Sequence, residues 1–567
     1  MRSARSPLAV WVAVAAAVRG LSAATHSAWG HPDEWFQTAE FGNLLANGLM
    51  SHTQEVGLHM RNLAWPSILA VPLALARWLD PAWVGLRVFL VQILAAAASL
   101  AIPWGVDRSL RAAGAGARTR HAALALVVLP FFTVAESVRP GQENLAAAAL
   151  WATLAMLASG RPMAAGALAV AVGAFKYPAG LLSAGIAAAL AWRALRNPRD
   201  RVTAARFAAG AGAGILVWGV PDWIFYGRPW ESLWMYAQYN LFTGLGTGRF
   251  GHQEAATFLT YFRGHWGGAL LPIAIAVLPC ALWGLYRGIR SVEPWAFAFA
   301  LYVAGHLAIG HKEPRFMAPV EALALWAAIA GARHAWPAAS ERLAGWSGSR
   351  ALRPALGALL AGVFLWNAAL TLRAAWGETW VANGTYFEVD RHLREYPSTC
   401  AVITVRKPLS IHLPWRNPSI APEPALGFFP SERREPSFAQ TGARPVIWIE
   451  RPRQCGPAQT LLVHVHKPDP GWDGQGCRLL RSGILNILPE GSWEPVIERG
   501  LASGSWYACP ASALGAFRLQ ETRHILARRL GRIARLPPPG ATGQELIRAG
   551  SAAPGGDAPA DGTMGDW

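Results

Sequence analysis

The sequence predicts an all-α membrane protein that crosses the bilayer about eleven times and carries a small α/β domain in its C-terminal part. Composition is the first reason, because 53% of the 567 residues are hydrophobic and 15% are charged, whereas soluble proteins average about 25% charged residues. The second is that the apolar residues gather in separate blocks, as a bilayer core about 30 Å thick requires. The third is that arginine clusters fall between blocks, as the positive-inside rule predicts for cytoplasmic loops.

The first apolar block, Leu8 to Ala24, follows Arg2 and Arg5 and so has features of a signal peptide. Arg19 interrupts this block, and an uncleaved first span agrees better with the count of later spans. The later apolar blocks include Val84 to Trp104, Ala122 to Ala135, Leu145 to Ser159, Leu270 to Leu285 and Leu356 to Leu372.

The formal net charge of +17 does not indicate a nucleic-acid partner. Nearly all the positive charge is arginine, which we attribute to genomic codon bias and to cytoplasmic loops. No recognisable nucleic-acid-binding module accompanies it. The lysines are Lys176, Lys312, Lys407 and Lys467.

The arginine clusters determine the predicted topology. If the first span leaves the cytoplasm, only one of the next two apolar blocks can cross back before the next cluster. Ala64 to Leu79 is shorter and contains prolines, so we expect an interfacial or re-entrant helix there and a crossing at Trp83 to Val106. Two short crossings then lie between Arg161 and Arg193, with a break at the turn from Lys176 to Gly180. The clusters are Arg108, Arg111, Arg118 and Arg120, then Arg193, Arg196, Arg199, Arg201 and Arg206, then Arg342, Arg350 and Arg353.

This topology puts the chain after Arg373 and every unusual polar loop on the extracytoplasmic side. We therefore expect a transmembrane domain at residues 1–373, an extracytoplasmic soluble domain at 374–536 and a disordered tail, rich in Pro, Gly, Ala and Asp, at 537–567. The loops are His26 to Leu63, Arg139 to Asn144, the Lys176 turn, Asp222 to His265 and His311 to Arg315.

The soluble domain is predicted to be α/β because it contains β-like runs at Cys400 to Val405, Pro445 to Glu450 and Thr460 to Val465. An oxidising compartment would allow up to two disulfides there, and four free core cysteines are the alternative. The cysteines of this domain are Cys400, Cys455, Cys477 and Cys509, whereas Cys280 lies in a predicted span.

Directly after the first span comes His31-Pro32-Asp33-Glu34, which places two acids and an imidazole at the membrane surface. A general base needs such a carboxylate within reach of an acceptor hydroxyl. The alternative is that Asp33 and Glu34 begin a helix, where the macrodipole favours acids.

A second motif, His311-Lys312-Glu313-Pro314-Arg315-Phe316, places three potential cations on the side where the positive-inside rule expects few. A phosphate leaving group would explain them, because Arg and Lys pair well with phosphate oxygens. Side chains that snorkel from helix ends are the alternative.

Together the two motifs resemble those of the dolichyl-phosphomannose-dependent mannosyltransferases of GPI-anchor and N-glycan assembly, a family with the multi-spanning GT-C fold. Its hallmarks are an H-P-D-E segment in the first luminal loop and an H-K-E-x-R-F segment much later, and both occur here in the same order and on the same predicted side. Weaker similarity lies at Arg139 to Glu143 and Asp222 to Gly227. The resemblance covers roughly residues 8 to 330 and not the soluble domain.

The resemblance implies transfer of a sugar, usually mannose, from a polyprenyl-phosphate carrier in the membrane lipid to a hydroxyl of a glycolipid or glycan acceptor, with inversion at the anomeric carbon. Asp33 would be the general base, and Glu34 would orient the acceptor or share the proton. The scheme requires no cofactor, because fixed cations can stabilise the developing charge, and it is compatible with a divalent metal. Substrate or phosphate would be bound by His31, Arg139, Glu143, Asp222, His311, Lys312 and Arg315.

Departures from the family pattern, including the long cysteine-bearing C-terminal domain, together with the codon bias suggest a bacterial relative in the inner membrane, with its site facing the periplasm or the cell exterior. Arg61-Asn62 stands where the family has Arg-Ser, and Lys176-Tyr177-Pro178 stands where it tends to have Arg-Pro-Thr. The alternative function is a lipid or glycolipid transporter or flippase. Transporters place functional charges near the bilayer midplane, whereas the charges here gather at one face.

Overall fold

The structure is a computed structural model that describes residues 6–25, 35–47, 59–79, 84–243, 253–258, 268–344, 362, 399–405, 446–448, 460–465, 478–480 and 505–510. The chain forms two compact units, which are described separately. The first holds the helices between Pro7 and Ala344, and the second holds five strands between Thr399 and Pro510. The expected domain boundaries and the expected disordered tail lie outside the described residues.

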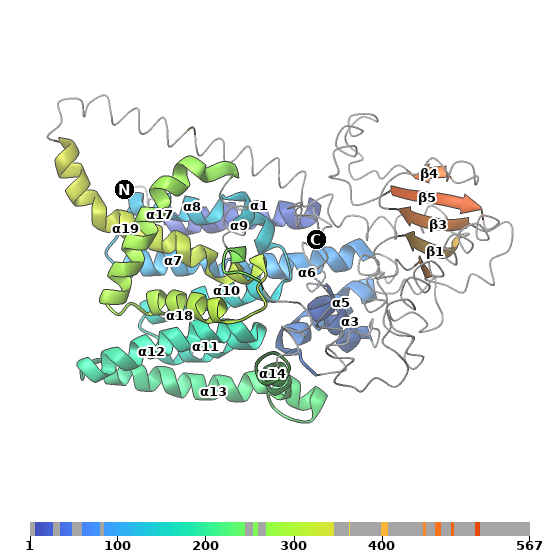
Figure 1. The fold of residues 1–567 in the computed structure, drawn as a ribbon, viewed down its shortest axis with the longest axis horizontal. Coiled ribbons are helices and arrows are strands. Elements are labelled where there is room, and N and C mark those ends of the chain that lie inside the picture. Colours follow the sequence, from blue (N-terminus) through green and yellow to red (C-terminus); the bar gives the residue numbers. More distant parts are fainter. Residues whose placement is uncertain are drawn as a thin grey trace, which may run out of the picture. The chain divides into compact units, whose positions relative to one another are not determined.

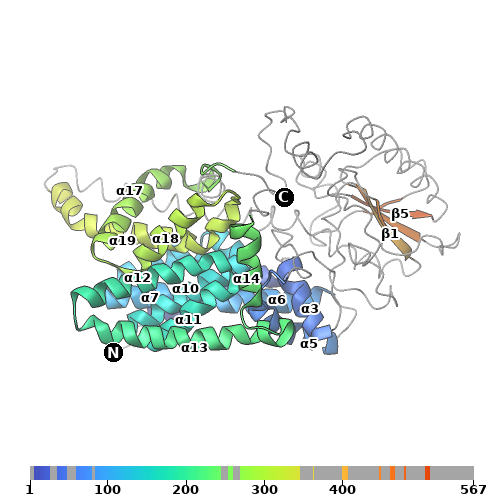
Figure 2. The same cartoon turned by 60° about the horizontal axis from the view of Figure 1, so that its bottom comes forward.

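The first unit is a bundle of helices (Figures 1 and 2). Its helices are α1 (Pro7–Thr25), η1 (Trp35–Ala39), α3 (Glu40–Asn47), α5 (Ala64–Leu79), α6 (Val84–Ser99), α7 (Ala101–Ala112), α8 (Ala117–Val128), α9 (Phe131–Ser137), α10 (Gln142–Ala158), α11 (Pro162–Phe175), η2 (Tyr177–Ala179), α12 (Gly180–Arg196), α13 (Asp200–Tyr226), α14 (Glu231–Ala237), η3 (Gln238–Phe242), α17 (Gly268–Arg290), α18 (Pro294–Ala308), η5 (Pro314–Met317) and α19 (Ala318–Ala344).

Helix α10 lies at the centre of this bundle and packs against α7, α11 and α19. Most of its residues are buried around the whole helix, which is typical of a helix surrounded by other helices. Trp151 in its middle meets Trp326 of α19 edge to face, with the ring centroids 6.0 Å apart. Trp326 in turn meets Trp295 of α18 at 6.5 Å, so the aromatic contacts join three helices.

Two helix pairs approach each other unusually closely through glycine. A Cβ atom on Gly166 of α11 would lie 2.0 Å from the carbonyl oxygen of Phe207, and one on Gly210 of α13 would lie 1.9 Å from that of Met163. The pair formed by α17 and α19 has the same arrangement at Gly284 and Gly331. Small residues that allow backbones to touch are typical of helix pairs in membranes.

The expected break near Lys176 is confirmed. α11 ends at Phe175, Lys176 is extended with φ −145° and ψ 111°, and η2 leads directly into α12. Because the chain reverses here, α11 and α12 pack side by side, and a Cβ on Gly173 would lie 3.3 Å from the backbone of Gly180.

Two of the predicted apolar blocks each contain a break between two helices. The stretch from Trp83 to Val106 contains two helices, α6 and α7, which meet at Leu100. Pro103 explains this break, because a proline ring collides with the carbonyl of the residue four positions earlier, here Ser99. Pro130 likewise separates α8 from α9 within the block Ala122 to Ala135.

Five stretches of the described residues are long and apolar enough to cross a membrane. They are Pro7–Ala24, Leu86–Ala112, Tyr177–Arg196, Asp200–Tyr226 and Arg315–Ala335. Shorter apolar helices lie at Ala64–Leu79, Pro162–Phe175 and Pro294–Ala308. The count of eleven crossings and the interfacial position of Ala64 to Leu79 remain predictions.

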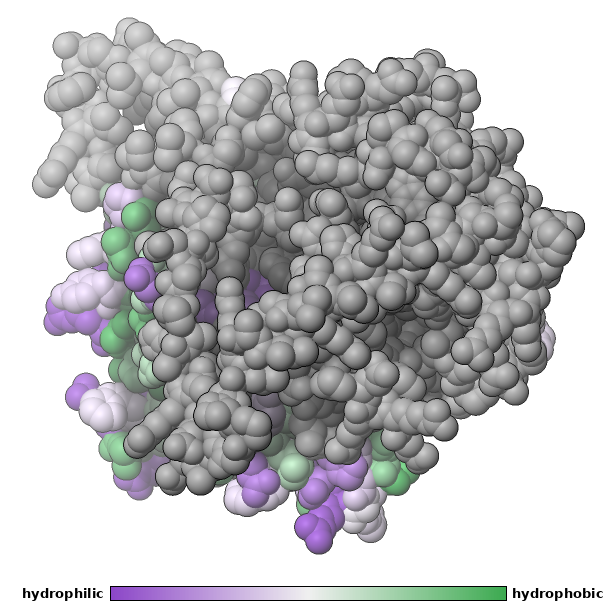
Figure 3. Space-filling view, turned by 45° about the vertical axis from the view of Figure 1, so that its right-hand side comes forward, coloured by the Kyte–Doolittle hydropathy of each residue, from purple (hydrophilic) through white to green (hydrophobic). Residues whose placement is uncertain are grey.

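Large apolar side chains are exposed on these helices, as expected of surfaces that face lipid. On α13, Leu216 and Ile224 are 76% and 79% exposed. Figure 3 shows hydrophobic residues in green beside hydrophilic residues in purple where the described chain reaches that face of the molecule.

The second unit contains a mixed sheet with the order β2-β1-β3-β5-β4. β1 and β3 are parallel, and the other neighbouring strands are antiparallel. The three β-like runs of the sequence coincide with β1, β2 and β3. The strands are β1 (Thr399–Val405), β2 (Val446–Trp448), β3 (Thr460–Val465), β4 (Arg478–Leu480) and β5 (Ser505–Pro510).

Candidate active site

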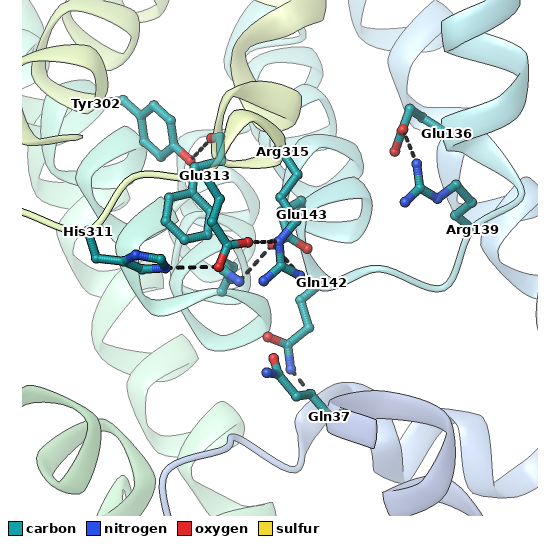
Figure 4. A network of polar contacts seen from close by, with 11 residues as sticks. Gln37, Glu136, Arg139, Gln142, Glu143, Tyr302, His311, Glu313 and Arg315 are labelled. Atoms are coloured by element: carbon teal, nitrogen blue, oxygen red, sulfur yellow. Dashed lines mark hydrogen bonds and ion pairs between the residues drawn. The ribbon is translucent and has the colours of Figure 1, made fainter. Parts of the chain in front are cut away.

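The second sequence motif lies between α18 and α19 (Figure 4). After α18 the chain forms a short loop and then the single turn η5, which begins at Pro314. Proline suits the first position of a helical turn because its φ is already helical and no N–H partner is needed there. The hydroxyl of Tyr302 on α18 donates a hydrogen bond to the carbonyl oxygen of Phe316 at 2.5 Å, which anchors the motif to the preceding helix.

Three polar side chains of this motif contact one another. Nε of Arg315 donates to Oε2 of Glu313 at 2.5 Å. Nε2 of His311 lies 2.9 Å from Oε1 of the same carboxylate. Glu313 therefore joins the imidazole to the guanidinium group, and Figure 4 shows it between them.

Glu143, in the first turn of α10, brings a second carboxylate to this group. Its Oε1 accepts a hydrogen bond from Nζ of Lys176 at 2.7 Å and lies 3.8 Å from Nη1 of Arg315. Glu143 and Lys176 are each 7% exposed, and a buried charge is costly unless it is paired. The break between α11 and α12 therefore places the Lys176 ammonium group beside the buried Glu143 carboxylate, which it neutralises.

The site thus contains a row in which basic and acidic side chains alternate. Two carboxylates stand between three basic side chains, and the ring of Phe316 lies 5.4 Å from Nζ of Lys176 and 5.7 Å from the guanidinium carbon of Arg315. An aromatic ring attracts such cations through its quadrupole. In order, the row is Lys176, Glu143, Arg315, Glu313 and His311.

Lys312 adds a cation whose partners are carbonyl oxygens. Its Nζ donates to the carbonyl of Gln253 at 3.1 Å and to that of Ile309, and the residue is buried. Carbonyl groups do not neutralise an ammonium charge. Among the described residues of the site, cations therefore outnumber carboxylates, and a bound anion would restore the balance.

The same site connects to the chain that follows the first motif. Nε2 of Gln142, the residue before Glu143, donates to the carbonyl oxygen of Gln37 in η1 at 3.4 Å. The described segment that contains Gln37 begins at Trp35, directly after the H-P-D-E motif. His31, Asp33 and Glu34 themselves lie outside the described residues, so their expected roles remain predictions.

Arg139 lies apart from the row of charges in Figure 4. It forms an ion pair with Glu136, three residues earlier in the chain. The amide of Asn144 donates to the carbonyl oxygens of both residues, at 2.6 Å to Glu136 and 3.3 Å to Arg139, which fixes the turn before α10.

Asp222 is fully buried near the end of α13, where it joins three segments. Its Oδ1 accepts a hydrogen bond from the backbone N–H of Leu63 at 3.3 Å. Its Oδ2 accepts one from the backbone N–H of Ser232 at 3.1 Å and another from the Ser232 hydroxyl. The Ser232 hydroxyl also contacts that of Tyr177, so Asp222 braces the turn that carries Lys176.

The structure therefore brings four of the expected site residues together, namely Glu143, His311, Lys312 and Arg315. Arg139 and Asp222 lie outside this group and contact other residues, Arg139 through an ion pair with Glu136 and Asp222 through hydrogen bonds from Leu63 and Ser232. Sequence reasoning did not assign Lys176, Glu313 or Gln253 to the site. Lys176 had a signal, because it is one of four lysines and lies at a predicted helix break. Glu313 lies inside the motif, whereas no local pattern distinguishes Gln253.

Within the described ranges, no group of three or more His, Cys, Asp or Glu side chains is arranged to hold a metal ion. The basic side chains described at the site are suited to an anionic ligand.

Comparisons with known proteins agree with this geometry. The sequence model of the Alg9-like mannosyltransferase family matches residues 10–399. Among solved structures, the crystal structure of ArnT from Cupriavidus metallidurans bound to undecaprenyl phosphate is 15% identical, with 88% of this chain and 97% of that chain covered and a TM-score of 0.50. The apo crystal structure of the same protein is 15% identical over 89% of this chain and 98% of that chain, with a TM-score of 0.47. A search of the curated proteins found no match.

The likeness to the first ArnT structure supports the expected GT-C membrane fold. The family match includes both sequence motifs and the helices that hold the row of charges. The chain therefore belongs to the Alg9-like mannosyltransferase family, and it is a membrane-bound glycosyltransferase.

Proposed function

We propose that the enzyme transfers mannose from a polyprenyl-phosphate carrier to a hydroxyl group of a glycolipid or glycan acceptor. The observation that carries this proposal is that cations outnumber carboxylates among the described residues of the site, which include Lys176, Lys312 and Arg315. When the bond between sugar and phosphate breaks, negative charge develops on the phosphate, and fixed cations stabilise it. The family match supports mannose, and the undecaprenyl phosphate in the ArnT structure supports the carrier.

In this proposal the departing phosphate binds beside Arg315, Lys312 and Lys176. Arg315 presents a planar fork that matches two phosphate oxygens, whereas the two lysines act as point charges. Glu143 and Glu313 hold the Arg315 side chain between them. The guanidinium group is then oriented before the donor arrives, and little reorganisation is needed during the reaction.

Asp33 is proposed to accept the proton of the acceptor hydroxyl, and Glu34 and His31 to orient the acceptor. Direct attack by that hydroxyl on the side opposite the phosphate inverts the anomeric carbon. Asp33 precedes Gln37 by four residues. Because a chain extends at most about 3.6 Å per residue, the Cα atom of Asp33 lies within about 15 Å of that of Gln37. Gln37 is itself bound by the neighbour of Glu143.

The contacts of α1 support a position of the site on the extracytoplasmic side. Nη2 of Arg111 donates to Oγ of Ser6 at 2.9 Å, so one predicted cytoplasmic arginine lies at the start of α1. Val138 packs with Ala23 near the other end of α1. The loop that leads to Glu143 is therefore at the end away from Arg111, and we propose that this end faces the periplasm of a bacterial cell.

The transporter alternative is not favoured, because the family that matches the chain is one of mannosyltransferases. A flippase would move the carrier across the bilayer without breaking the bond between sugar and phosphate. Release of free polyprenyl phosphate together with a mannosylated acceptor therefore separates the two functions.

The test is transfer of radiolabelled mannose from polyprenyl-phosphate mannose to endogenous acceptors in membranes that contain the enzyme. Arg315→Ala should lower the rate by about 10²-fold, since loss of one preorganised donor to a developing charge costs about that much. Arg315→Lys should restore only part of the rate, because the planar fork is missing. Arg199→Ala, an exposed position before α13, is the matched control.

The same assay tests the base. Asp33→Asn should lower turnover by about 10² to 10⁴-fold, and Glu34→Gln should lower it less. Full activity of Arg315→Ala would show that Arg315 does not bind the leaving phosphate and is a side chain that snorkels from a helix end. Transfer of a different sugar but not mannose would overturn the assigned substrate while leaving the reaction class intact.

A further inference from the structure

Lys176 and Tyr177 are neighbours in the chain but contact different helices. The Lys176 ammonium group donates to Glu143 of α10, whereas the hydroxyl of Tyr177 contacts the Ser232 hydroxyl of α14. The backbone N–H of Ala179 donates to the carbonyl oxygen of Lys176 at 2.8 Å and closes the turn around Tyr177. A displacement of Tyr177 is therefore passed to Lys176.

Helix α14 contacts the Tyr177 side chain at two points. Ser232 contacts its hydroxyl group. Tyr236 meets its ring, with the two ring centroids 5.3 Å apart. Residues four apart lie on the same face of a helix, so one face of α14 fixes both the ring and the hydroxyl of Tyr177.

Asp222 on α13 holds the Ser232 hydroxyl. Oδ2 of Asp222 accepts from the backbone N–H of Ser232 at 3.1 Å and also contacts its hydroxyl. A hydroxyl has one hydrogen to donate and lone pairs that accept, so Ser232 can join Asp222 and Tyr177 in one chain of hydrogen bonds. Asp222 and Ser232 are fully buried, and buried polar networks of this kind restrict the positions of their members.

A second contact attaches α14 to α13. Nε1 of Trp230, the residue before α14, donates to the carbonyl oxygen of Ile215 at 2.9 Å. The indole packs closely on α13, since a Cβ atom on Gly219 would lie 2.6 Å from the same nitrogen. α14 is thus fixed to α13 both through Trp230 and through Asp222, and it provides a fixed support for Tyr177.

We infer that Tyr177 and Ser232, held by Asp222, are positioning residues that place the Lys176 ammonium group for the leaving phosphate. This inference rests on the proposed function. It gives Asp222 a role that acts through the protein, in place of the substrate contact that the family resemblance implies. Negative charge develops on the phosphate as the bond to the sugar breaks, so a displaced cation should lower kcat and change KM little.

The experiment measures kcat and KM for polyprenyl-phosphate mannose with the purified full-length enzyme. Tyr177→Phe keeps the ring and removes the hydroxyl. It should lower kcat by about 10-fold, since a misplacement of about 1 Å can cost about 10²-fold. Asp222→Asn should lower kcat in the same way. A rise in KM with kcat unchanged, for either variant, would indicate a direct contact with the substrate and overturn the inference.

The effect must pass through Lys176, so it should vanish when Lys176 is replaced. In a Lys176→Met background, Tyr177→Phe should change kcat by less than about 2-fold. An equal loss of kcat with and without Lys176 would show that the Tyr177 hydroxyl does not act through the cation. The matched control is Tyr286→Phe, which removes an exposed hydroxyl that accepts from Arg290 on α17 and should leave kcat unchanged.

A second measurement does not depend on sugar transfer. Reductive methylation, followed by mass spectrometry of each peptide, reports how accessible a lysine is to the reagent. Lys176 and Lys312 are both buried, so both should react slowly in the wild type. Tyr177→Phe should raise the rate at Lys176 several-fold and leave Lys312 unchanged.

Faster methylation of both lysines would show a general loosening of the protein, and no change at either would show that Tyr177 does not hold the turn. Either result would overturn the inference. Selective exposure of Lys176 by Tyr177→Phe, in an enzyme that transfers no mannose, would retain the positioning of Lys176 and refute the proposed function.

Discussion

Glu143 sets the spacing between two cations from distant parts of the chain. Lys176 comes from the break between α11 and α12, and Arg315 comes from η5, yet both face one oxygen of Glu143. Without the carboxylate the two positive groups would repel each other in a buried place. The Glu143 side chain therefore holds the two cations in place.

Replacement of Glu143 should show this through stability. Glu143→Gln leaves the buried Lys176 without its charge partner, and breaking a buried ion pair in this way costs about 3 to 5 kcal/mol. Lys176→Met in the same chain should recover part of the loss, because it removes the charge that has no partner. Unfolding of the purified protein by denaturant, for both single variants and the double variant, measures the coupling. Additive effects within about 0.5 kcal/mol would show that the two residues do not interact.

Single residues also show where sequence reasoning stops. The charges of the second motif could be predicted as a group, because His311, Lys312 and Arg315 are close in sequence and unusual on their side of the membrane. The junction formed by Asp222 could not, since its partners Leu63 and Ser232 come from other parts of the chain. An acid at a helix end has the same local pattern whether it binds a ligand or the backbone N–H groups of its neighbours.

At the scale of elements, prolines decided which helix boundaries were predictable. The break at Lys176 was predicted because Pro178 and Gly180 stand together in a polar turn. The break at Leu100 was not predicted, because Pro103 lies inside an apolar block without a polar turn. Its ring disturbs the helix several residues earlier in the chain, so the position of the break is not evident from the proline itself. Pro130 acts in a similar way between α8 and α9. Apolar blocks therefore indicated that helices exist, whereas steric effects of single prolines set their ends.

The strand order constrains the predicted disulfides. β3 lies between β1, which holds Cys400, and β5, which holds Cys509. Neighbouring strands are 4.7 to 4.9 Å apart, so strands two apart are separated by about 9.5 Å, whereas a disulfide joins Cα atoms closer than about 7 Å. We expect a digest of the unreduced protein, read by mass spectrometry, to contain disulfide-linked peptides but none that joins Cys400 to Cys509. Such a linked peptide would show that the strand order is wrong.

At the scale of the whole molecule, the helical unit has two chemically different ends. Arginines and the buried Asp107 form ion pairs at one end, with Nε of Arg111 2.8 Å from Oδ2 and Nη2 of Arg120 2.5 Å from Oδ1. The row of charges around Glu143 lies beyond the opposite end of α1. The sequence predicted this separation from loop composition alone, because the rule that places arginine in the cytoplasm depends only on which loop holds it.

Reporter fusions test this polarity. A reporter after Gly114, which lies in the exposed turn between α7 and α8, should be active only in the cytoplasm. A reporter after Arg373, which lies outside the described residues, should be active only on the extracytoplasmic side. Cytoplasmic activity of the reporter after Arg373 would overturn the count of eleven crossings. Extracytoplasmic activity of the reporter after Gly114 would reverse the side of the membrane assigned to the site.

The glycine contact between α17 and α19 also limits how the enzyme can exchange its substrates. A Cβ on Gly331 would lie 1.8 Å from the carbonyl oxygen of Cys280, and one on Gly284 would lie 1.9 Å from that of Ala327. Sliding α19 by one residue, about 1.5 Å along its axis, would bring a bulkier neighbour to each of these points. The two helices are therefore held in one register, and under the proposed function any movement of Arg315 that admits or releases a carrier is confined to η5 and the loop before it.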